Sequence, residues 1–435
     1  MKKGHIYELI YEAQNPRVMG VCFPAVRDLM SALKNGTGND NPLLLNGKRV
    51  VKRAHAYGVS QSGRFLREML YWGFNEDETG RQVLDGVIPH VSGSGLGSFN
   101  HRFAQPTRHA SQHDHHDYPP DRFPFSYGSQ RDPFSGEHDG ILKRCQASGT
   151  TPIVLHTQSE AEYWTRSGSL THTDPLGRTD FENTAAVRIY LFGGTQHGPG
   201  GWPPSKGDGK TLSNPGDYRP FLRALLLGLD RTVASRITTG QEGDFYEDHL
   251  PQSVFPTIAA GTLVDWKQDS TGFPKIPGIL YPKIIQQPQF LDFGPRWQTE
   301  RIIDHQPPVP RGDYRVLAPK CDADGNVLDC LLPPEVVVPV ATYTGWNLRN
   351  AEAGAENDLV SLRGSYIQFP KTKAERDKSG DPRLSIEERY GTQQEYLRQL
   401  KTACRKLHED GYLLEEDIER TIRIQTERTA DLFEP

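Results

Sequence analysis

The spacing of apolar residues changes repeatedly between residues 1 and 236. Short apolar runs bounded by small or turn-forming residues are typical of strands, and they occur at 6–11, 49–58, 84–93, 151–157 and 186–194. Apolar residues three and four positions apart predict amphipathic helices at 21–34, 61–71 and 217–235. Because strands alternate with helices, the sequence predicts an α/β protein with a mostly parallel sheet and flanking helices.

Two long segments lack this alternation. Residues 99–149 are rich in His, Pro, Asp and aromatic residues and show little periodicity, which is typical of an insertion that forms a lid or a binding wall. After residue 236 the chain becomes irregular and rich in proline, and it ends in charged helices. We therefore expect a core at 1–236, with the lid inside it, and a C-terminal extension at 237–435 that packs on the core.

Charge and composition narrow the classes of partner. The net charge of −5 over 435 residues gives no case for binding nucleic acid or an anionic membrane surface. No apolar run approaches the roughly 18 residues of a membrane span. Glu8 and Glu12 interrupt the apolar N-terminus, which makes it a poor signal peptide. The composition predicts a soluble protein with a small-molecule substrate. The sequence as written indicates the cytoplasm but leaves the location open, and the charged helical tail could mediate formation of a homo-oligomer.

The residues that point to chemistry begin with the stretch Gly58-Val59-Ser60-Gln61-Ser62, which joins a predicted strand to a predicted helix. This order fits the nucleophile elbow G-x-S-x-G, in which the serine occupies a sharp turn and bulky residues two positions away would clash. Ser62 is small enough for the second glycine position, but it is the poorer nucleophile because Arg64 lies two positions after it. Ser60 is the predicted nucleophile, and the N–H of Gln61 is the predicted oxyanion donor.

A histidine and two glutamates follow in the chain order Ser, acid, His. His197 lies in a glycine-rich loop after an apolar strand, where a general base could reach Ser60. Glu160 and Glu162 follow an earlier strand, and either carboxylate could hold the tautomer of His197. The residues alone barely separate the two glutamates. The pattern predicts a serine hydrolase, acting on an ester or related acyl bond without a cofactor.

A metal-dependent hydrolase is a less favoured alternative. The segment His109–Asp117 holds four histidines and two aspartates that could bind a divalent ion. It falls on a predicted irregular loop, and no H-E-x-x-H helix supports it, so we predict a polar loop and no metal site. Cys321 and Cys330 flank a predicted hairpin turn, and whether they could form a disulfide depends on the register of that hairpin and on an oxidising compartment.

Several stretches resemble a group of large bacterial alpha/beta hydrolase domain proteins, and the resemblance extends over nearly the whole chain. They include "AYGVSQSGRFLREMLYWGFNEDETGRQVLDGVIPHVSG", "AEYWTRSGSLTHTD", "RIYLFGGTQHGPG" and "FPKTKAERDKSGDPRLSIEERYG". The resemblance implies an α/β-hydrolase fold with a Ser-His-Glu triad. In that group the place of Glu160 usually holds a small residue, so the resemblance implies that Glu162 is the acid.

The resemblance also raises an alternative to an active hydrolase. Relatives are longer at the N-terminus and often exported, and in the superfamily a loop after an early strand gives a second oxyanion N–H. This chain has room for about one strand and one helix before Ser60, and losing one donor costs roughly 100- to 1,000-fold in rate. The alternative is a catalytically impaired or truncated member with a binding or structural role. In an active enzyme, we expect Tyr163, Trp164 and His101 to line the substrate pocket.

Overall fold

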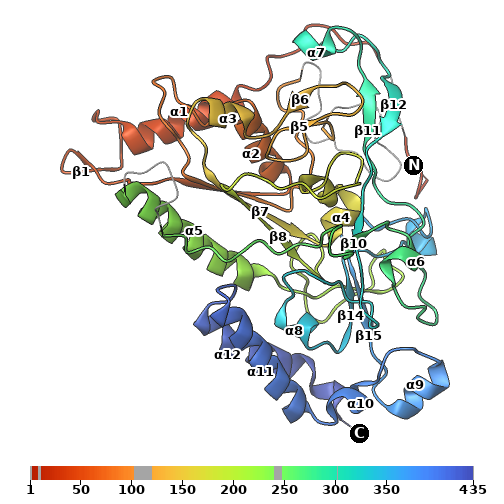
Figure 1. Cartoon of the computed structure of the whole chain (residues 1–435). Coiled ribbons are helices and arrows are strands. Elements are labelled where there is room, and N and C mark those ends of the chain that lie inside the picture. Colours follow the sequence, from red (N-terminus) through yellow and green to blue (C-terminus); the bar gives the residue numbers. More distant parts are fainter. Residues whose placement is uncertain (1, 8–10, 102–119, 240–246, 301, 435) are drawn as a thin grey trace.

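The computed structural model describes residues 2–7, 11–101, 120–239, 247–300 and 302–434. At its centre is a four-stranded parallel sheet in the order β3-β4-β7-β8. Figure 1 labels two of its strands, β7 and β8. The strands are β3 (His55–Val59), β4 (Gly86–His90), β7 (Ile153–Ser159) and β8 (Val187–Phe192). They coincide with four of the predicted apolar runs, and the predicted α/β class is confirmed.

Helices cover both faces of this sheet because successive strand residues point to opposite sides. Val87 packs in an apolar cluster with helices on one face, whereas Ile88 packs in a cluster with a helix on the other. The first face is covered by α1 (Cys22–Asn35), α2 (Gln61–Tyr71) and α3 (Lys143–Ala147), and the second by α5 (Arg219–Thr239). All three helices predicted in the first 236 residues are present.

Strand β3 forms one edge of the sheet. Within the described part of the chain, no strand pairs with its outer side, and the side chains of Tyr57 and Val59 are 53% and 43% exposed. The strand predicted at 6–11 does not supply this pairing. Ile6, Tyr7 and Tyr11 are exposed and lie outside any strand, and 8–10 are not among the described residues. The side chains of Ile6, Tyr7 and Tyr11 cover no sheet surface, so that prediction is wrong for the residues described.

The second half of the predicted lid is part of the core. Phe125, Tyr127 and Ile141 are buried, and Tyr127 and Ile141 pack with α2 and α3. A short hairpin of β5 (Gln130–Arg131) and β6 (His138–Asp139) lies between them. The aromatic content of the segment therefore reflects packing from 120 to 149. Residues 102–119, where the polar loop was predicted, lie outside the described residues.

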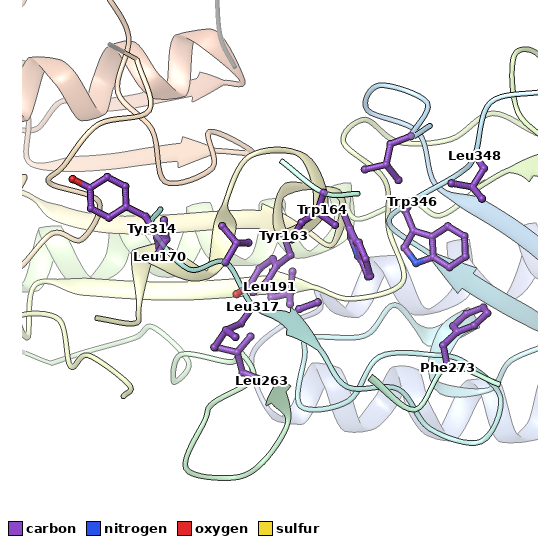
Figure 2. Packing of buried hydrophobic residues seen from close by; sticks show 14 of the residues in the cluster. Tyr163, Trp164, Leu170, Leu191, Leu263, Phe273, Tyr314, Leu317, Trp346 and Leu348 are labelled. Carbon is purple, nitrogen blue, oxygen red and sulfur yellow. The ribbon is translucent and has the colours of Figure 1, made fainter. Parts of the chain in front are cut away.

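The C-terminal part packs directly against the sheet. Short backbone bridges join Tyr190 to Val254 and Phe192 to Leu331, so this part extends the sheet beyond β8. The largest apolar cluster combines residues from both sides of position 236, including Tyr163, Leu191, Leu263 and Trp346 (Figure 2). The division at 236 stays a prediction, but the apolar packing is continuous across it.

The remaining elements are short or belong to the helical end of the chain. The strands are β1 (Leu44–Leu45), β2 (Lys48–Arg49), β9 (Leu212–Ser213), β10 (Leu263–Val264), β11 (Gln289–Asp292), β12 (Val309–Asp313), β13 (Ala318–Pro319), β14 (Ala341–Thr344) and β15 (Ser365–Gln368). The helices are α4 (Ala161–Thr165), α6 (Gln268–Thr271), α7 (Trp297–Glu300), α8 (Pro334–Val337), α9 (Lys373–Ser379), α10 (Ile386–Tyr390), α11 (Gln393–Glu409) and α12 (Glu415–Arg428).

The predicted hairpin near Cys321 and Cys330 exists, but in a register that separates the two cysteines. Cys321 lies opposite Val327, so Cys330 falls beyond the end of the pairing. Both are free thiols. The disulfide that one of the two registers would have permitted is absent from this structure.

Candidate active site

Ser60 occupies a strained turn between β3 and α2. Its backbone has φ +57° and ψ −114°, a conformation that non-glycine residues adopt rarely and that concentrates at functional sites. The turn is held from both sides, because Ser60 N–H donates to His90 O at 2.8 Å and Ser60 O accepts from Arg64 N–H at 3.0 Å. A Cβ at Gly58 would lie 2.5 Å from Ser62 O. Glycine two positions before Ser60 is therefore a steric requirement of this turn.

Glu162 lies in the first turn of α4, three residues after the end of β7, and has no exposed surface. Its Oε1 is 2.5 Å from His197 Nδ1, and its Oε2 accepts hydrogen bonds from Ser159 N–H at 2.8 Å and Ser159 Oγ at 2.7 Å. Burial acts to raise the pKa of Glu162, but the charge and hydrogen bond of His197 and the donors of Ser159 outweigh it and lower the pKa. An ionised carboxylate only accepts, so Nδ1 of His197 is the donor.

Glu160 is also buried but contacts a different part of the site. Its Oε2 accepts a hydrogen bond from Gly194 N–H at 3.0 Å. Burial raises the pKa of Glu160 to about 7, and backbone donors from Gly345 and Gly194 only partly oppose this. The structure thus pairs His197 with Glu162, and Glu160 braces the backbone of the loop that bears His197.

That loop is fixed by side chains that the sequence did not single out. Tyr218 donates a hydrogen bond from its hydroxyl to His197 O at 2.6 Å. Asn214 donates from Nδ2 to Gly194 O at 2.9 Å and to Thr344 O at 3.0 Å. Tyr218 and Asn214 are separated from His197 by a segment without periodicity, so no sequence pattern links them to the histidine. Ser159 could have been identified from the sequence, because it lies at the end of a strand next to the two glutamates.

Ser60, Glu162 and His197 all follow the carboxyl ends of parallel strands, β3, β7 and β8 respectively. In a parallel sheet these ends share one edge, which is where open α/β sheets bind ligands. Among the contacts of the described residues, there is no hydrogen bond from Ser60 Oγ to the imidazole of His197. Such catalytic contacts are often long before substrate binds.

A second histidine, His90, lies beside this group at the end of β4. It is buried, its Nδ1 is 2.8 Å from Thr157 Oγ1, and its ring packs edge-on against Tyr218 at 4.9 Å. Burial lowers the pKa of His90 to about 4, although the charge of Glu162 opposes the shift. His90 is therefore neutral near pH 7 and packs under the site without a carboxylate partner of its own among the described residues.

The residues predicted to line the substrate pocket are buried. Tyr163 and Trp164 lie in the largest apolar cluster (Figure 2), where the Tyr163 hydroxyl is 2.6 Å from His172 Nε2 and Trp164 packs against Trp346. His101 is buried with its ring 5.2 Å from that of Trp297. These contacts give all three a packing role, and contact with substrate stays a prediction.

Gln61 is the first residue of α2, directly after Ser60. Amide groups at a helix N-terminus carry partial positive charge, which stabilises a nearby anion. This position suits the predicted oxyanion role of the Gln61 N–H, which stays a prediction.

The sequence predicted neither a metal site nor a membrane span, and the described residues can be searched for both. Among the described residues, no group of three His, Cys, Asp or Glu side chains is arranged to hold a metal ion, and the His109–Asp117 segment lies outside them. Within the same residues, no helix is both long and apolar enough to cross a membrane.

A helix-flanked parallel sheet with a sharp strand-to-helix turn at its carboxyl edge is the architecture of the α/β-hydrolase fold. The family described as "Alpha/beta hydrolase domain" matches residues 5–423, so the chain belongs to that family. This confirms the resemblance and its implied fold. Searches of curated proteins and of solved structures give no match.

Proposed function

We propose that this protein is a serine hydrolase that cleaves an ester or related acyl bond. Ser60 is the nucleophile, His197 the general base and Glu162 the carboxylate that orients His197. The observation that carries the proposal is the pairing of His197 Nδ1 with the buried Glu162 at 2.5 Å. This pairing leaves Nε2 as the nitrogen that can accept a proton, as an acid–base residue beside a serine requires.

The proposed reaction has two stages. Ser60 Oγ attacks the substrate carbonyl carbon while its proton passes to His197 Nε2, and the negative charge on the carbonyl oxygen is stabilised by the Gln61 N–H. The C–O bond to the leaving alcohol then breaks, and His197 donates the proton to that alcohol. Water repeats the sequence on the acyl-serine, releasing the acid and restoring Ser60.

The test is intact-mass analysis after incubation with a fluorophosphonate, which reacts with activated serines. The wild-type protein is expected to gain one adduct, and Ser60→Ala is expected to gain none. Ser62→Ala is the matched control, because it removes a neighbouring hydroxyl in the same turn, and it should retain the adduct. An adduct that persists in Ser60→Ala would contradict the assignment.

A second candidate is a member of the fold that binds ligands without turnover. The observation in its favour is that, among the described residues, no hydrogen bond joins Ser60 Oγ to His197. It predicts a folded protein with no adduct and no hydrolysis of any ester. The fluorophosphonate measurement therefore separates the two candidates directly.

A further inference from the structure

Arg64 is a buried cation one helical turn after Ser60. Its side chain is 4% exposed, and its Nη1 is buried without a hydrogen-bond partner among the described residues. No ion pair to Arg64 occurs within the same part of the chain. A buried guanidinium normally has acceptors for its donors, because an unpaired buried charge is costly.

Arg67, one turn further along α2, shows what a structural arginine looks like in this environment. It is completely buried, and its Nη1 also lacks a partner among the described residues. Its Nε and Nη2, however, donate hydrogen bonds to three backbone carbonyl groups, those of Gly95, Ser94 and Phe125. Arg67 thereby ties α2 to the loop after β4. Arg64 makes no comparable contacts within the described residues, so its burial is not explained by bracing the backbone.

The acid nearest to Arg64 on the same helix is already engaged. Glu68 accepts hydrogen bonds from Trp72 Nε1 at 3.1 Å and from Phe99 N–H at 3.4 Å. Burial raises the pKa of Glu68 to about 7, which reduces its negative charge near neutral pH. Asp121 is the other acid whose charge acts on Arg64.

A second buried arginine lies close to Arg64 and next to the candidate site. Arg166 follows α4, and its N–H donates to Glu162 O at 2.9 Å while its O accepts from Ser94 N–H at 3.1 Å. Burial, together with the charge of Arg64, lowers the pKa of Arg166 to about 10. The charges of Asp121 and Glu162 act on Arg166 as well.

Arg64 therefore carries a buried positive charge without an ion pair among the described residues. Asp121 and Glu68 are the acids whose charges act on it, and Glu162 is committed to His197 and Ser159. In a region of low dielectric, an anion that binds such a guanidinium stabilises it strongly. A carboxylate suits such a place, because its two oxygens match the planar fork of an arginine.

We infer that Arg64 binds a carboxylate of the substrate, so that the preferred substrates are esters with a free carboxylate near the scissile bond. The inference rests on the proposed function, and it deepens it by naming a substrate class. Arg64 would be a specificity-determining residue that touches substrate at a point remote from the reacting carbon. Neutral esters of the same shape would leave its charge buried and unpaired, which lowers their transition-state binding.

The test compares pairs of esters that differ only in a carboxylate replaced by a methyl group. Monomethyl succinate, glutarate and adipate are paired with methyl butanoate, pentanoate and hexanoate, and kcat/KM is measured by proton release. For at least one pair, the wild-type protein is expected to prefer the acid by at least about tenfold. Arg64→Met is expected to reduce this ratio to near one, and Arg64→Lys, which keeps the charge and loses the fork, to an intermediate value.

A matched control and a binding measurement keep the result interpretable. Arg53→Met removes an arginine that pairs with Asp230 before β3 begins, and it should leave the ratio unchanged. Calorimetry with Ser60→Ala should detect the preferred hemiester, and Ser60→Ala/Arg64→Met should not bind it. Circular dichroism confirms folding, and if Arg64→Met does not fold, the Arg64→Lys result decides.

The outcomes separate the two proposals. Equal kcat/KM within every pair, or equal ratios in wild type and folded Arg64 variants, would overturn the inference while leaving the serine hydrolase intact. If no ester is hydrolysed and no adduct forms, the proposed function fails. In that case the inferred substrate class fails with it, even if Ser60→Ala binds the hemiester through Arg64.

Discussion

The turn that bears Ser60 lies at the edge of the sheet, whereas the turn that bears Glu162 lies in its interior. Strand β3 exposes Tyr57 and Val59 just before Ser60, and every residue of β7 before Glu162 is buried. Ser60 is positioned by its backbone, through a positive φ and the close approach of Gly58 to Ser62. Glu162 is positioned by side-chain hydrogen bonds in a dry environment.

This difference teaches which kind of substitution each turn tolerates. A backbone-defined turn is sensitive to an added Cβ and tolerates changes in side-chain polarity. A turn defined by hydrogen bonds to a buried charge is sensitive to the loss of a donor or of the charge, because each lost partner leaves desolvated groups unpaired. The predictions below test this contrast, in order of their expected effect on activity.

Replacing the carboxylate of Glu162 is expected to have the largest effect. In Glu162→Gln the amide cannot carry the charge that holds Nδ1–H of His197, so the imidazole loses its orienting partner. We expect kcat/KM to fall by about 10⁴-fold, as for the loss of the acid in other triads, with the fold retained. Steady-state kinetics and circular dichroism check this.

The matched control for this variant is Glu182→Gln at an exposed position, which should leave the kinetics unchanged. If Glu162→Gln retained most of the activity while Glu160→Gln lost it, the pairing in the structure would not be the one used in catalysis. The roles of the two glutamates would then have to be exchanged.

Adding a methyl group at Gly58 is expected to have the next largest effect. In Gly58→Ala the new Cβ would meet Ser62 O at 2.5 Å, so the backbone of the turn must move. We expect a loss of about 1–3 kcal/mol in the free energy of unfolding and about 100-fold in activity, because Ser60 is displaced. Urea denaturation and kinetics measure both.

Gly201→Ala is the control, since a Cβ there has no atom within 4 Å. It adds the same methyl group in the loop that follows His197 and should change neither quantity appreciably. Equal effects of the two substitutions would show that the elbow has no special steric demand at Gly58.

The sharp turn from β3 to α2 at Ser60 is the local structure that the sequence predicted best, and there is a physical reason. Its constraint is local, so Gly58, Ser60 and the small Ser62 are all present within five residues. The strands and helices around this turn could be predicted equally well, because the spacing of their apolar residues reflects packing against one sheet. The apolar stretch at 6–11 led to a wrong strand prediction for a related reason. A pattern of apolar residues is the same whether or not a neighbouring strand is available to pair with them.

The rest of the site depends on contacts between distant segments, which no local pattern records. Nothing in the residues themselves separated Glu160 from Glu162, and the difference lies in which backbone and imidazole groups approach each carboxylate. Tyr163 and Trp164 look like pocket residues in the sequence, and their burial comes from the C-terminal segment that covers them. Arg64 looked merely too bulky for a motif, and its missing acceptors became visible only in three dimensions.

Removing the hydroxyl of Ser159 is expected to have a moderate effect. Ser159→Ala deletes one of the donors to Glu162 Oε2 and leaves the backbone N–H of the same residue in place. Loss of that donor raises the pKa of Glu162, so the carboxylate is protonated at higher pH and the acidic limb of the pH–rate profile moves upward. We expect about tenfold lower kcat/KM, equivalent to one hydrogen bond to a charged group.

The control is Ser126→Ala, which removes another buried hydroxyl, the donor to Gly128 O at 2.9 Å, far along the chain from Glu162. It is expected to lower the free energy of unfolding without moving the pH–rate profile. A profile that shifts equally in both variants would show that the effect is a general loss of stability.

Glu160→Gln is expected to change activity least, because Glu160 braces the backbone of Gly194 and does not contact His197. The main effect of this substitution is expected in how the free energy of unfolding depends on pH. The folded-state pKa is about 7 and the ordinary value is 4.5, so the native protein holds a proton that the unfolded chain releases between these values. The free energy of unfolding of the wild-type protein therefore falls as pH rises from about 4.5 to about 7, by at most roughly 3 kcal/mol from this group.

The amide that replaces the carboxyl group in Glu160→Gln does not ionise, so the stability of this variant relative to wild type should increase with pH across this window and then level off. Glu68, the other acid whose pKa is about 7, is present in both proteins and cancels in the difference. Urea denaturation at pH 5, 6, 7 and 8 measures it. A difference that is constant with pH would mean that the carboxyl of Glu160 is ionised in the folded protein like that of Glu162, and the contrast between the two glutamates would be lost.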